Sequence, residues 1–515
     1  MPATAYVSTT IPYVNARPHL GHAFEYVQAD SISRHLTMTG REVYFLTGSD
    51  ENSLKNVLAA EKAGMTTQAL VDRNVSYFEE LLASLGVVTT AFIRTSIDPH
   101  HLAGAAEVWR RLDANDDIYA KDYAGLYCVG CEQFYEPSDL VDGKCPEHLV
   151  EPELVSERNY FFRLSRYGDQ LAEAIESGRL QVHPHTRLNE TLSFIRSGLA
   201  DISISRSATR ARGWGIPVPG DPSQVMYVWI DALTNYINTF DWIQDDPGYH
   251  RYWADAERRI HVLGKGVLRF HAVYWPAMLL AAKLPLPTDV MVHGYITNAG
   301  QKLSKSLGNA VDPEELVAAF GQDAVRYYLL AELSPFGDGD FAEERLVARY
   351  NNDLANGIGN LASRLTSMVE RYRGGTVPAR GEAGDLEVEL ESRTADAVRD
   401  SVAAMDRFDH REALARIGEL VRRSNAYVGE RAPWHLAKAA DAGDEDAART
   451  LDAVLYCGID VVRRIAILLR PFIPAGSGRL LGAVGEDPAA SLDSLTELAG
   501  RKVVKAGPIF PRIEL

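Results

Sequence analysis

Two histidines lie one helical turn apart near the N-terminus, His19 and His22, with Gly21 between them. They follow a strand-like segment and a turn. The start of a helix presents free N–H groups and a positive dipole end to phosphate. Imidazoles can donate hydrogen bonds to phosphate oxygens as their charge grows. The pattern predicts a nucleotide site, although on its own a helix start with two incidental histidines explains it more simply.

Two lysines in a glycine-rich segment could complete such a site. Lys302 and Lys305 belong to the sequence Lys-Leu-Ser-Lys-Ser. A mobile loop with two ammonium groups can close over a triphosphate and neutralise pyrophosphate as it leaves. Taken alone, the segment is explained equally well as a solvated basic loop.

Three of the four cysteines and one histidine form two close pairs, Cys128 with Cys131 and Cys145 with His148. The two residues between the members of each pair are the spacing of a zinc knuckle. Four protein ligands leave no open coordination position, so we expect one structural Zn²⁺ ion. The alternative is three separate thiols and a surface histidine.

The bulk composition limits the class of protein. At 515 residues, with 46% hydrophobic and 24% charged residues, the chain is expected to form several globular domains. Its net charge of −17 excludes a general nucleic-acid coat, which would be basic. The few cysteines exclude a disulfide scaffold. Because no signal sequence and no span of ~20 apolar residues is present, we expect a cytoplasmic protein with no membrane partner.

The elements that could position these residues alternate in the first part of the chain. Residues 6–10 and 43–46 have the composition of strands, and residues 19–39 between them have a helical period. Strand, helix and strand in this order predict a βαβ unit and therefore a Rossmann-like parallel sheet. We expect residues 224–228 and 259–263 to be further strands of the same sheet.

The pattern then changes twice, first to short strands and turns around the cysteines and later to long amphipathic helices. The predicted fold class is α/β: a Rossmann-like parallel-sheet core with a zinc-bearing insertion, plus a C-terminal all-α bundle. The expected domains are residues 1–116 and 215–298 for the core, 117–214 for the insertion, 299–345 for a linker with the lysine loop, and 346–515 for the bundle.

In this order, the histidine and lysine motifs resemble the two signatures of class I aminoacyl-tRNA synthetases. Leu20 and Leu303 replace the usual isoleucine and methionine, and leucine keeps a similar apolar volume. Residues 9–15, 227–236 and 270–277 resemble the segments that form the amino-acid pocket of methionyl-tRNA synthetases. The resemblance implies a methionine–tRNA ligase that activates L-methionine with ATP and transfers it to tRNA(Met), for elongation and initiation of translation.

By position, the resemblance implies a methionine-binding set of mostly apolar and aromatic side chains. A thioether prefers aromatic edges, and one carboxylate, Asp50, suffices for the substrate ammonium. Without the resemblance these aromatics would be core residues, and for Phe270 and Trp275 packing is the larger expected role. The implied methionine-binding residues are Ile11, Tyr13, Asp50, Trp229, Ala232, Leu233, Tyr236, Val267 and His271.

The resemblance also implies residues for ATP and for the tRNA anticodon. Mg²⁺ would accompany ATP. Amides, a guanidinium and an indole can read and stack on unpaired bases, although the same residues could form only a polar helix face and a buried tryptophan. The implied catalytic residues are His19, His22, Lys302 and Lys305; the ATP-binding residues Gly21, His22, Gly294 and Lys305; and the anticodon-binding residues Asn356, Asn360, Arg364 and Trp434.

Two departures from the family leave other functions open. Gly266 stands where an acidic residue is expected near the ATP ribose, and Asn52-Ser53 stands where His-Gly is usual. A duplicated synthetase with a specialised role is one alternative. Others are a class I synthetase for cysteine, leucine, isoleucine or valine, and a nonenzymatic tRNA-binding scaffold. No dimerising C-terminal module is recognised, so we expect a monomer.

Overall fold

The computed structural model divides the chain into two compact units. It describes residues 2–128, 133–135, 137–146, 149–298, 301–302, 311–504 and 507–514. The predicted site residues Cys131, His148 and Lys305 lie outside these ranges. Unit 1 comprises Met1–Glu25, Gly40–Ala83 and Val88–His293, and unit 2 comprises Tyr26–Thr39, Ser84–Val87 and Gly294–Leu515.

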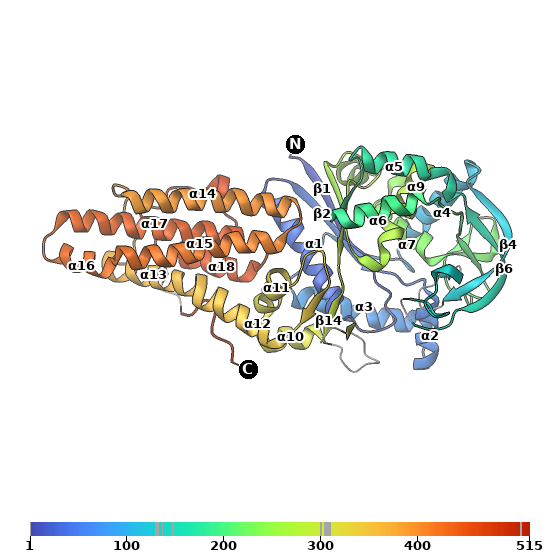
Figure 1. Cartoon of the computed structure of the whole chain (residues 1–515), viewed down its shortest axis with the longest axis horizontal. Helices are drawn as coiled ribbons and strands as arrows, with labels where there is room; N and C mark the ends of the chain where they lie inside the picture. The colour runs from blue at the N-terminus through green and yellow to red at the C-terminus, as the bar shows by residue number, and fades with distance from the viewer. Residues whose placement is uncertain are drawn as a thin grey trace. The chain divides into compact units, whose positions relative to one another are not determined.

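A six-stranded sheet with all neighbours parallel forms the centre of unit 1 (Figure 1). Its order is β3-β2-β1-β12-β13-β7. Chain order reverses between β1 and β12, so the carboxyl ends of these two strands are the switch point at which such sheets bind ligands. The predicted Rossmann-like sheet is confirmed. The strands are β1 (Thr4–Thr9), β2 (Glu42–Ser49), β3 (Ala91–Arg94), β7 (Gln181–His183), β12 (Arg258–Gly264) and β13 (Asp289–His293).

Helices cover the sheet of unit 1. Every residue of β13 and every residue of β1 except the first is buried. The largest buried side chains of this core include Trp253 and Trp275. Helix α1 (Leu20–Met38) begins in unit 1 and continues in unit 2. The other α-helices of unit 1 are α2 (Leu54–Ala63), α3 (Thr67–Ser84), α4 (Pro99–Ala114), α5 (Gly168–Glu176), α6 (His185–Arg196), α7 (Val228–Asn238), α8 (Pro247–Tyr249) and α9 (Trp275–Ala282).

The segment expected to insert into the core contains a long antiparallel pair of strands. Strand β4 (Ile118–Cys128) pairs with β6 (Glu153–Phe162) in a four-stranded sheet of order β5-β4-β6-β8. The other two strands of this sheet are β5 (Gln133–Tyr135) and β8 (Ile202–Ser203). Later in the same segment, β7 joins the edge of the parallel sheet.

One strand expectation is wrong. Residues 224–228 do not belong to the parallel sheet, because β11 (Asp221–Met226) lies in an antiparallel sheet between β10 (Pro217–Val218) and β9 (Ser205–Ser207). Residues 227 and 228 instead lead into α7. The strand at 259–263 is confirmed as part of β12. A short apolar run shows that a strand forms, but it does not identify the strand's partner.

Unit 2 ends in the predicted helical bundle, in which α14, α15 and α17 pack against one another (Figure 1). A small sheet of β15, β14 and β16 precedes it. These strands are β14 (Ile296–Asn298), β15 (Gln301–Lys302) and β16 (Gly339–Phe341). The helices are α10 (Pro313–Phe320), α11 (Gln322–Ala331), α12 (Glu343–Arg349), a π-helix (Tyr350–Gly359), α13 (Asn360–Arg373), α14 (Asp385–Asp406), α15 (His410–Arg431), α16 (Pro433–Asp441), α17 (Glu445–Leu469) and α18 (Pro474–Ala483).

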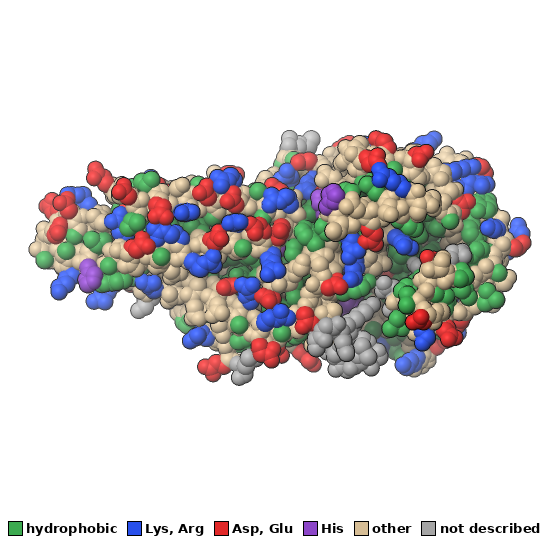
Figure 2. All heavy atoms as spheres, in the orientation of Figure 1, with side chains coloured by type: hydrophobic (Ala, Val, Ile, Leu, Met, Phe, Trp, Pro, Cys, Tyr) green, Lys and Arg blue, Asp and Glu red, His purple; other side chains and the backbone are tan. Residues whose placement is uncertain are grey.

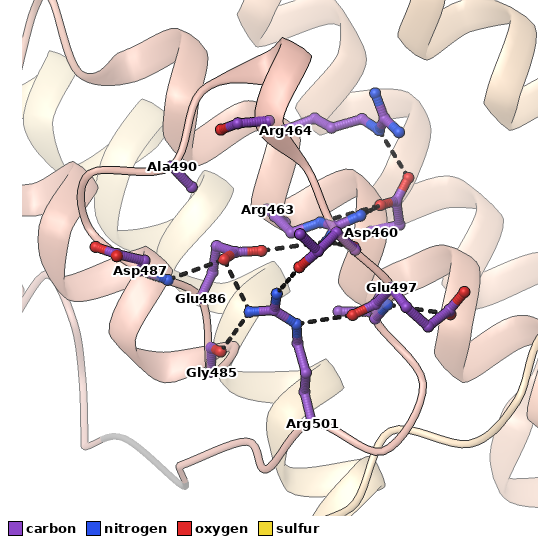
Figure 3. Close-up of polar contacts among 12 residues, drawn as sticks. Asp460, Arg463, Arg464, Gly485, Glu486, Asp487, Ala490, Glu497 and Arg501 are labelled. Carbon is purple, nitrogen blue, oxygen red and sulfur yellow. Dashed lines mark hydrogen bonds and ion pairs between the residues drawn. The ribbon is translucent and has the colours of Figure 1, made fainter.

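Ion pairs fix the segment after α18 onto α17 (Figure 3). Glu486 accepts from Arg463 Nη1 at 3.2 Å and from Arg501 Nη1 at 2.8 Å. Arg463, which is buried, also donates to the Thr496 carbonyl at 3.0 Å and to Asp460. One carboxylate therefore joins the bundle helix to the chain's C-terminal segment.

Among the described helices, none is both long and apolar enough to span a bilayer. The visible surface of the bundle mixes both signs of charge: Lys and Arg side chains are interspersed with Asp and Glu (Figure 2).

Candidate active site

The two histidines of the first motif lie at the start of α1, as expected. Their rings stack with centroids 3.8 Å apart. The His19 N–H donates to His22 Nδ1 at 3.1 Å, and the Gly21 N–H lies 3.1 Å from His19 Nδ1. His22 also meets the edge of Phe78 at 5.4 Å. The two imidazoles are thus held together at a helix N-terminus, the local geometry that favours an anion.

Two predicted ATP-binding glycines lie where a side chain would collide. A Cβ at Gly21 would come 2.9 Å from His19 Cε1. In unit 2, a Cβ at Gly294 would come 2.2 Å from the backbone of Gly337. Backbone packing therefore requires glycine at Gly294, whereas at Gly21 the exposed His19 ring could move aside. The backbone of Lys302 lies in β15.

The predicted methionine-binding residues of unit 1 come from the carboxyl ends of β1, β2 and β12 and from α7. Asp50, directly after β2, is 2% exposed. Its N–H donates to the Pro12 carbonyl at 2.9 Å, and Tyr13 pairs with it as an isolated bridge. The Asp50 backbone is therefore tied to the segment that follows β1, at the edge of the switch point.

Aromatic rings form one side of this region. Trp229 stacks on Phe270 with centroids 3.8 Å apart and planes within 13°, and its ring meets the edge of Tyr13 at 6.2 Å. Phe270 is therefore part of the aromatic surface and not only core. Ile11 and Val267 are half-buried, whereas Ala232 and Leu233 are buried. These apolar and aromatic side chains suit a thioether.

A chain of hydrogen bonds fixes Tyr236 and His271. The His271 Nδ1–H donates to the Val267 carbonyl at 2.9 Å, so its Nε2 accepts from the Tyr236 hydroxyl at 2.7 Å. Burial lowers the pKa of His271 to about 4, which keeps the imidazole neutral. Burial likewise raises the pKa of Tyr236 well above its ordinary value. Both groups are uncharged near pH 7 and therefore suit an apolar substrate.

A neighbouring histidine, which the sequence did not single out, packs against the ring of Tyr236 with centroids 4.2 Å apart. His261 in β12 lies 2.7 Å from Ser8 Oγ and accepts from Trp275 Nε1 at 3.2 Å. Burial lowers its pKa well below the ordinary value. Trp275 is fully buried and packs against Tyr236, so its role here is packing, as expected.

Glu25, which no sequence motif identified, connects the carboxyl ends of β1, β12 and β13. Its carboxylate accepts from the Thr10 N–H at 2.8 Å and the Gly264 N–H at 3.2 Å, and it lies 3.0 Å from His293 Nε2. In the sequence Glu25 is a single acidic residue three positions after His22, and its neighbours on the helix face include the polar residues His22 and Gln28. Glu25 holds the switch point together beneath the first motif.

The structure describes two of the four predicted zinc ligands, Cys128 and Cys145. Both are buried in a small core with Tyr135, whose hydroxyl lies 3.5 Å from Cys145 Sγ. No cluster of three metal-ligating side chains occurs among the residues with described positions. Since Cys131 and His148 are not among them, the zinc site stays a prediction.

The predicted anticodon residues lie at the surface of the bundle in unit 2. Asn356 and Asn360 are exposed and Arg364 is half-buried. Asn356 lies in the π-helix, whereas Asn360 and Arg364 lie in α13. The number of residues per turn therefore changes between Asn356 and Asn360. Trp434, at the start of α16, is 41% exposed. An indole this exposed is available to stack on a base, which contradicts the simpler reading of a buried tryptophan.

Known proteins resemble the whole chain. Residues 5–153 and 149–366 match a family model described as tRNA synthetases class I (M), and residues 377–513 match the anticodon binding domain of methionyl tRNA ligase. The methionine–tRNA ligase of Mesorhizobium japonicum is 42% identical over 92% of this chain and 90% of its own length. That of Rhizobium meliloti is 41% identical over 98% of both chains.

Solved structures agree with these matches. The Mycobacterium tuberculosis methionyl-tRNA synthetase in complex with methionyl-adenylate is 39% identical, with a TM-score of 0.93. The match covers 99% of this chain and all of the other. The apo form of the same enzyme is 36% identical with a TM-score of 0.87.

Proposed function

The chain belongs to the methionyl family of class I tRNA synthetases, and from this premise we propose that it activates L-methionine with ATP and transfers the methionyl group to tRNA(Met). The observation that carries the proposal is the set of groups at the switch point. Stacked aromatic rings, neutral Tyr236 and His271, and one buried carboxylate converge there. Such a set fits an apolar amino acid with one ammonium group.

Two kinds of group recognise methionine in this proposal: a carboxylate, and a set of aromatic and apolar side chains. Asp50 pairs with the α-ammonium, because a carboxylate is the strongest acceptor for it. Tyr13, Trp229 and Phe270 contact the thioether, whose polarizable sulfur favours aromatic rings. Ile11, Ala232, Leu233 and Val267 supply the remaining apolar surface. A charged or strongly polar side chain would be rejected here, because burying it without partners is costly.

Adenylation needs positioning and charge stabilisation rather than a protein nucleophile. The methionine carboxylate oxygen attacks the α-phosphorus of ATP, and the bond to the bridging oxygen breaks to release pyrophosphate. His19 and His22 donate to the phosphate oxygens, and Lys302 and Lys305 neutralise the departing pyrophosphate. Gly21 and Gly294 lie against the nucleotide. Mg²⁺ accompanying ATP would supply further charge neutralisation.

Transfer follows on the same adenylate. A terminal ribose hydroxyl of the tRNA attacks the methionyl carbonyl, and AMP leaves with the electron pair of the broken acyl–phosphate bond. Asn356, Asn360, Arg364 and Trp434 recognise the anticodon. In this assignment residues 346–515 form the anticodon-binding bundle, residues 299–345 the linker with the lysine loop, and residues 1–116 and 215–298 the catalytic core.

The insertion at residues 117–214 carries one structural Zn²⁺ ion in this proposal. Support comes from the chemistry of the donor set and from the burial of two of the thiols, Cys128 and Cys145. Cys131 and His148 supply the other two ligands. Zinc thiolates would stabilise a segment whose own core is small.

ATP–pyrophosphate exchange with purified protein, one amino acid at a time, tests the proposed function. The assay reports adenylation alone and needs no tRNA. We expect exchange with methionine and at least tenfold less with cysteine, leucine, isoleucine or valine. Exchange driven by one of these four would assign another class I specificity. No exchange with any of them would favour a nonenzymatic or specialised role.

A further inference from the structure

A second acidic residue, Glu51, lies next to the proposed ammonium-binding Asp50 and is fully buried. Its carboxylate accepts from the Ser49 hydroxyl at 2.6 Å and from the Ser96 hydroxyl. Arg94 donates to both of its oxygens, from Nε at 2.7 Å and from Nη2 at 3.0 Å. A bidentate arginine–carboxylate pair fixes geometry as well as charge.

Arg94 in turn connects this pair to a separate helix. Its Nη2 also donates to Asp72 in α3 at 2.6 Å. The Arg94 side chain is 22% exposed and that of Asp72 is 49% exposed. The outer half of the network is therefore solvated, whereas the Glu51 half is shielded, so the inner pair determines the geometry.

Three side chains hold the backbone of Asp50 and Glu51 through four hydrogen bonds. The Glu51 N–H donates to Thr95 Oγ1 at 2.9 Å, and Trp214 Nε1 donates to the Glu51 carbonyl at 2.7 Å. Asn56 Nδ2 donates to the carbonyls of both Glu51, at 2.9 Å, and Asp50, at 3.1 Å.

These partners belong to the segment after β3, to α2 and to the loop before β10. None of them is adjacent to Asp50 in sequence. A turn anchored in this way has little freedom to shift.

We propose that Glu51 and Arg94 are positioning residues that fix the Asp50 carboxylate for the substrate ammonium. The inference rests on the proposed function, because it assigns Asp50 to methionine. It adds that selectivity for an α-amino acid depends on an ion pair that does not contact the substrate. A displacement of about 1 Å at such a site can reduce activity about a hundredfold.

The variant that tests the pair is Glu51→Gln combined with Arg94→Gln. Removing both charges avoids the unpaired buried carboxylate that Arg94→Gln alone would leave, which would destabilise the fold. Arg94→Lys is the conservative variant, since it keeps the charge but loses the bidentate geometry. Arg110→Gln is the matched control, because Arg110 forms an exposed ion pair with Glu107 in α4. Melting temperatures establish that each variant is folded.

Pyrophosphate exchange then gives the KM values for methionine and ATP. The paired variant should raise the methionine KM at least tenfold and leave the ATP KM within twofold of wild type. Arg94→Lys should raise the methionine KM by less than the paired variant does. Arg110→Gln should have the methionine KM of wild type. An unchanged methionine KM in a folded paired variant overturns the inference, whereas a wild-type protein that does not use methionine overturns the proposed function first.

An analogue without the ammonium group separates positioning from general damage. 4-(Methylthio)butanoate is methionine without its amino group, and its inhibition constant is measured in the exchange assay. If the pair acts on Asp50, the paired variant should bind this analogue within twofold of wild type while losing affinity for methionine. Equal losses for both ligands would show a disturbed pocket and would overturn the inference.

A double-mutant cycle with Asp50→Asn provides the final check. Asp50→Asn alone should raise the methionine KM. In that background the paired substitution should have no further effect, because the group that it positions is already changed. Multiplicative effects of the two changes would mean that the pair acts independently of Asp50 and would overturn the inference.

Discussion

At the scale of single residues, Tyr236 and His271 of the proposed methionine pocket are both neutral near pH 7. His271 uses Nδ1–H for a backbone carbonyl and accepts from Tyr236 at Nε2. A proton added at Nε2 would oppose the tyrosine hydroxyl and place a charge beside stacked rings. Burial therefore selects one tautomer and one charge state. Neutral Tyr236 and His271 are consistent with the proposal that this region binds an apolar side chain.

This neutrality predicts the pH dependence of stability. The pKa of His271 is about 4 in the folded protein, below the value of 6.5 for an exposed imidazole. As the pH falls from 6.5 to 4, the unfolded chain takes up a proton that the folded protein does not. The free energy of unfolding therefore decreases over this range and levels off below it.

Each unit of pKa difference corresponds to about 1.4 kcal/mol, so His271 contributes a loss of about 3 kcal/mol. His271→Gln should show a shallower loss than wild type when chemical denaturation is followed from pH 7 to pH 4. His250→Gln is the control, because His250 is exposed and its pKa is raised by Asp245. Identical slopes for wild type and His271→Gln would contradict a buried neutral imidazole.

At the scale of elements, the sequence predicted those helices and strands that depend on a local hydrophobic pattern. The βαβ unit, β12 and the bundle follow from periodicity and were confirmed. The partner of β11 was not predictable, since a strand's neighbour depends on distant residues. Nor did periodicity indicate the π-helix at Tyr350–Gly359, whose register differs from that of an α-helix.

The same limit applies to the residues of the candidate site. Motifs singled out residues such as Asp50 and Trp229, whose role in methionine binding stays a prediction. They did not identify Glu25 or Arg94, which bind backbone and side chains from several strands or helices. Such roles depend on tertiary contacts, and a single acidic or basic residue carries no pattern that would reveal them.

The zinc knuckle gives a prediction about the insertion. Purified protein should contain one zinc per chain, and Cys131→Ser should lose it, because a thiolate ligand is removed. Cys457→Ser is the control, since Cys457 lies in the bundle. Zinc removal should also lower the melting temperature. Unchanged zinc content in Cys131→Ser, measured by elemental analysis, would refute the ligand assignment.

The ion-pair cluster on α17 predicts the stability of the bundle. Glu486→Gln removes one of the two carboxylates that pair with Arg463, which is 3% exposed, and leaves Asp460 as the other. Removing the only partner of a buried charge costs about 3–5 kcal/mol, so we expect the loss of one of two partners to cost part of this free energy of unfolding. Glu445→Gln removes the same charge from a side chain that is 90% exposed and should cost little. Equal denaturation midpoints for the two variants would show that the cluster in Figure 3 does not stabilise the bundle.

At the scale of the whole molecule, a net charge of −17 must be reconciled with a polyanionic partner. Basic side chains lie among acidic ones on the visible face of the bundle (Figure 2). Nonspecific attraction to RNA is therefore weak, and recognition has to rely on a few local contacts. Stacking suits this situation, because it gains energy without needing excess positive charge.

The residues proposed to bind methionine lie in unit 1 and those proposed to bind the anticodon lie in unit 2, so we expect a substitution at the anticodon site to change tRNA charging but not methionine activation. Trp434→Ala should raise the KM for tRNA about tenfold or more, because stacking on one base contributes about 1–3 kcal/mol. The same variant should leave methionine-dependent pyrophosphate exchange unchanged, since none of the residues proposed to bind methionine lies in unit 2. Val388→Ala is the control, because Val388 is an apolar residue of the bundle that is 56% exposed. Equal effects of Trp434→Ala on exchange and on charging would indicate a folding defect, and no effect on charging would remove Trp434 from the anticodon site.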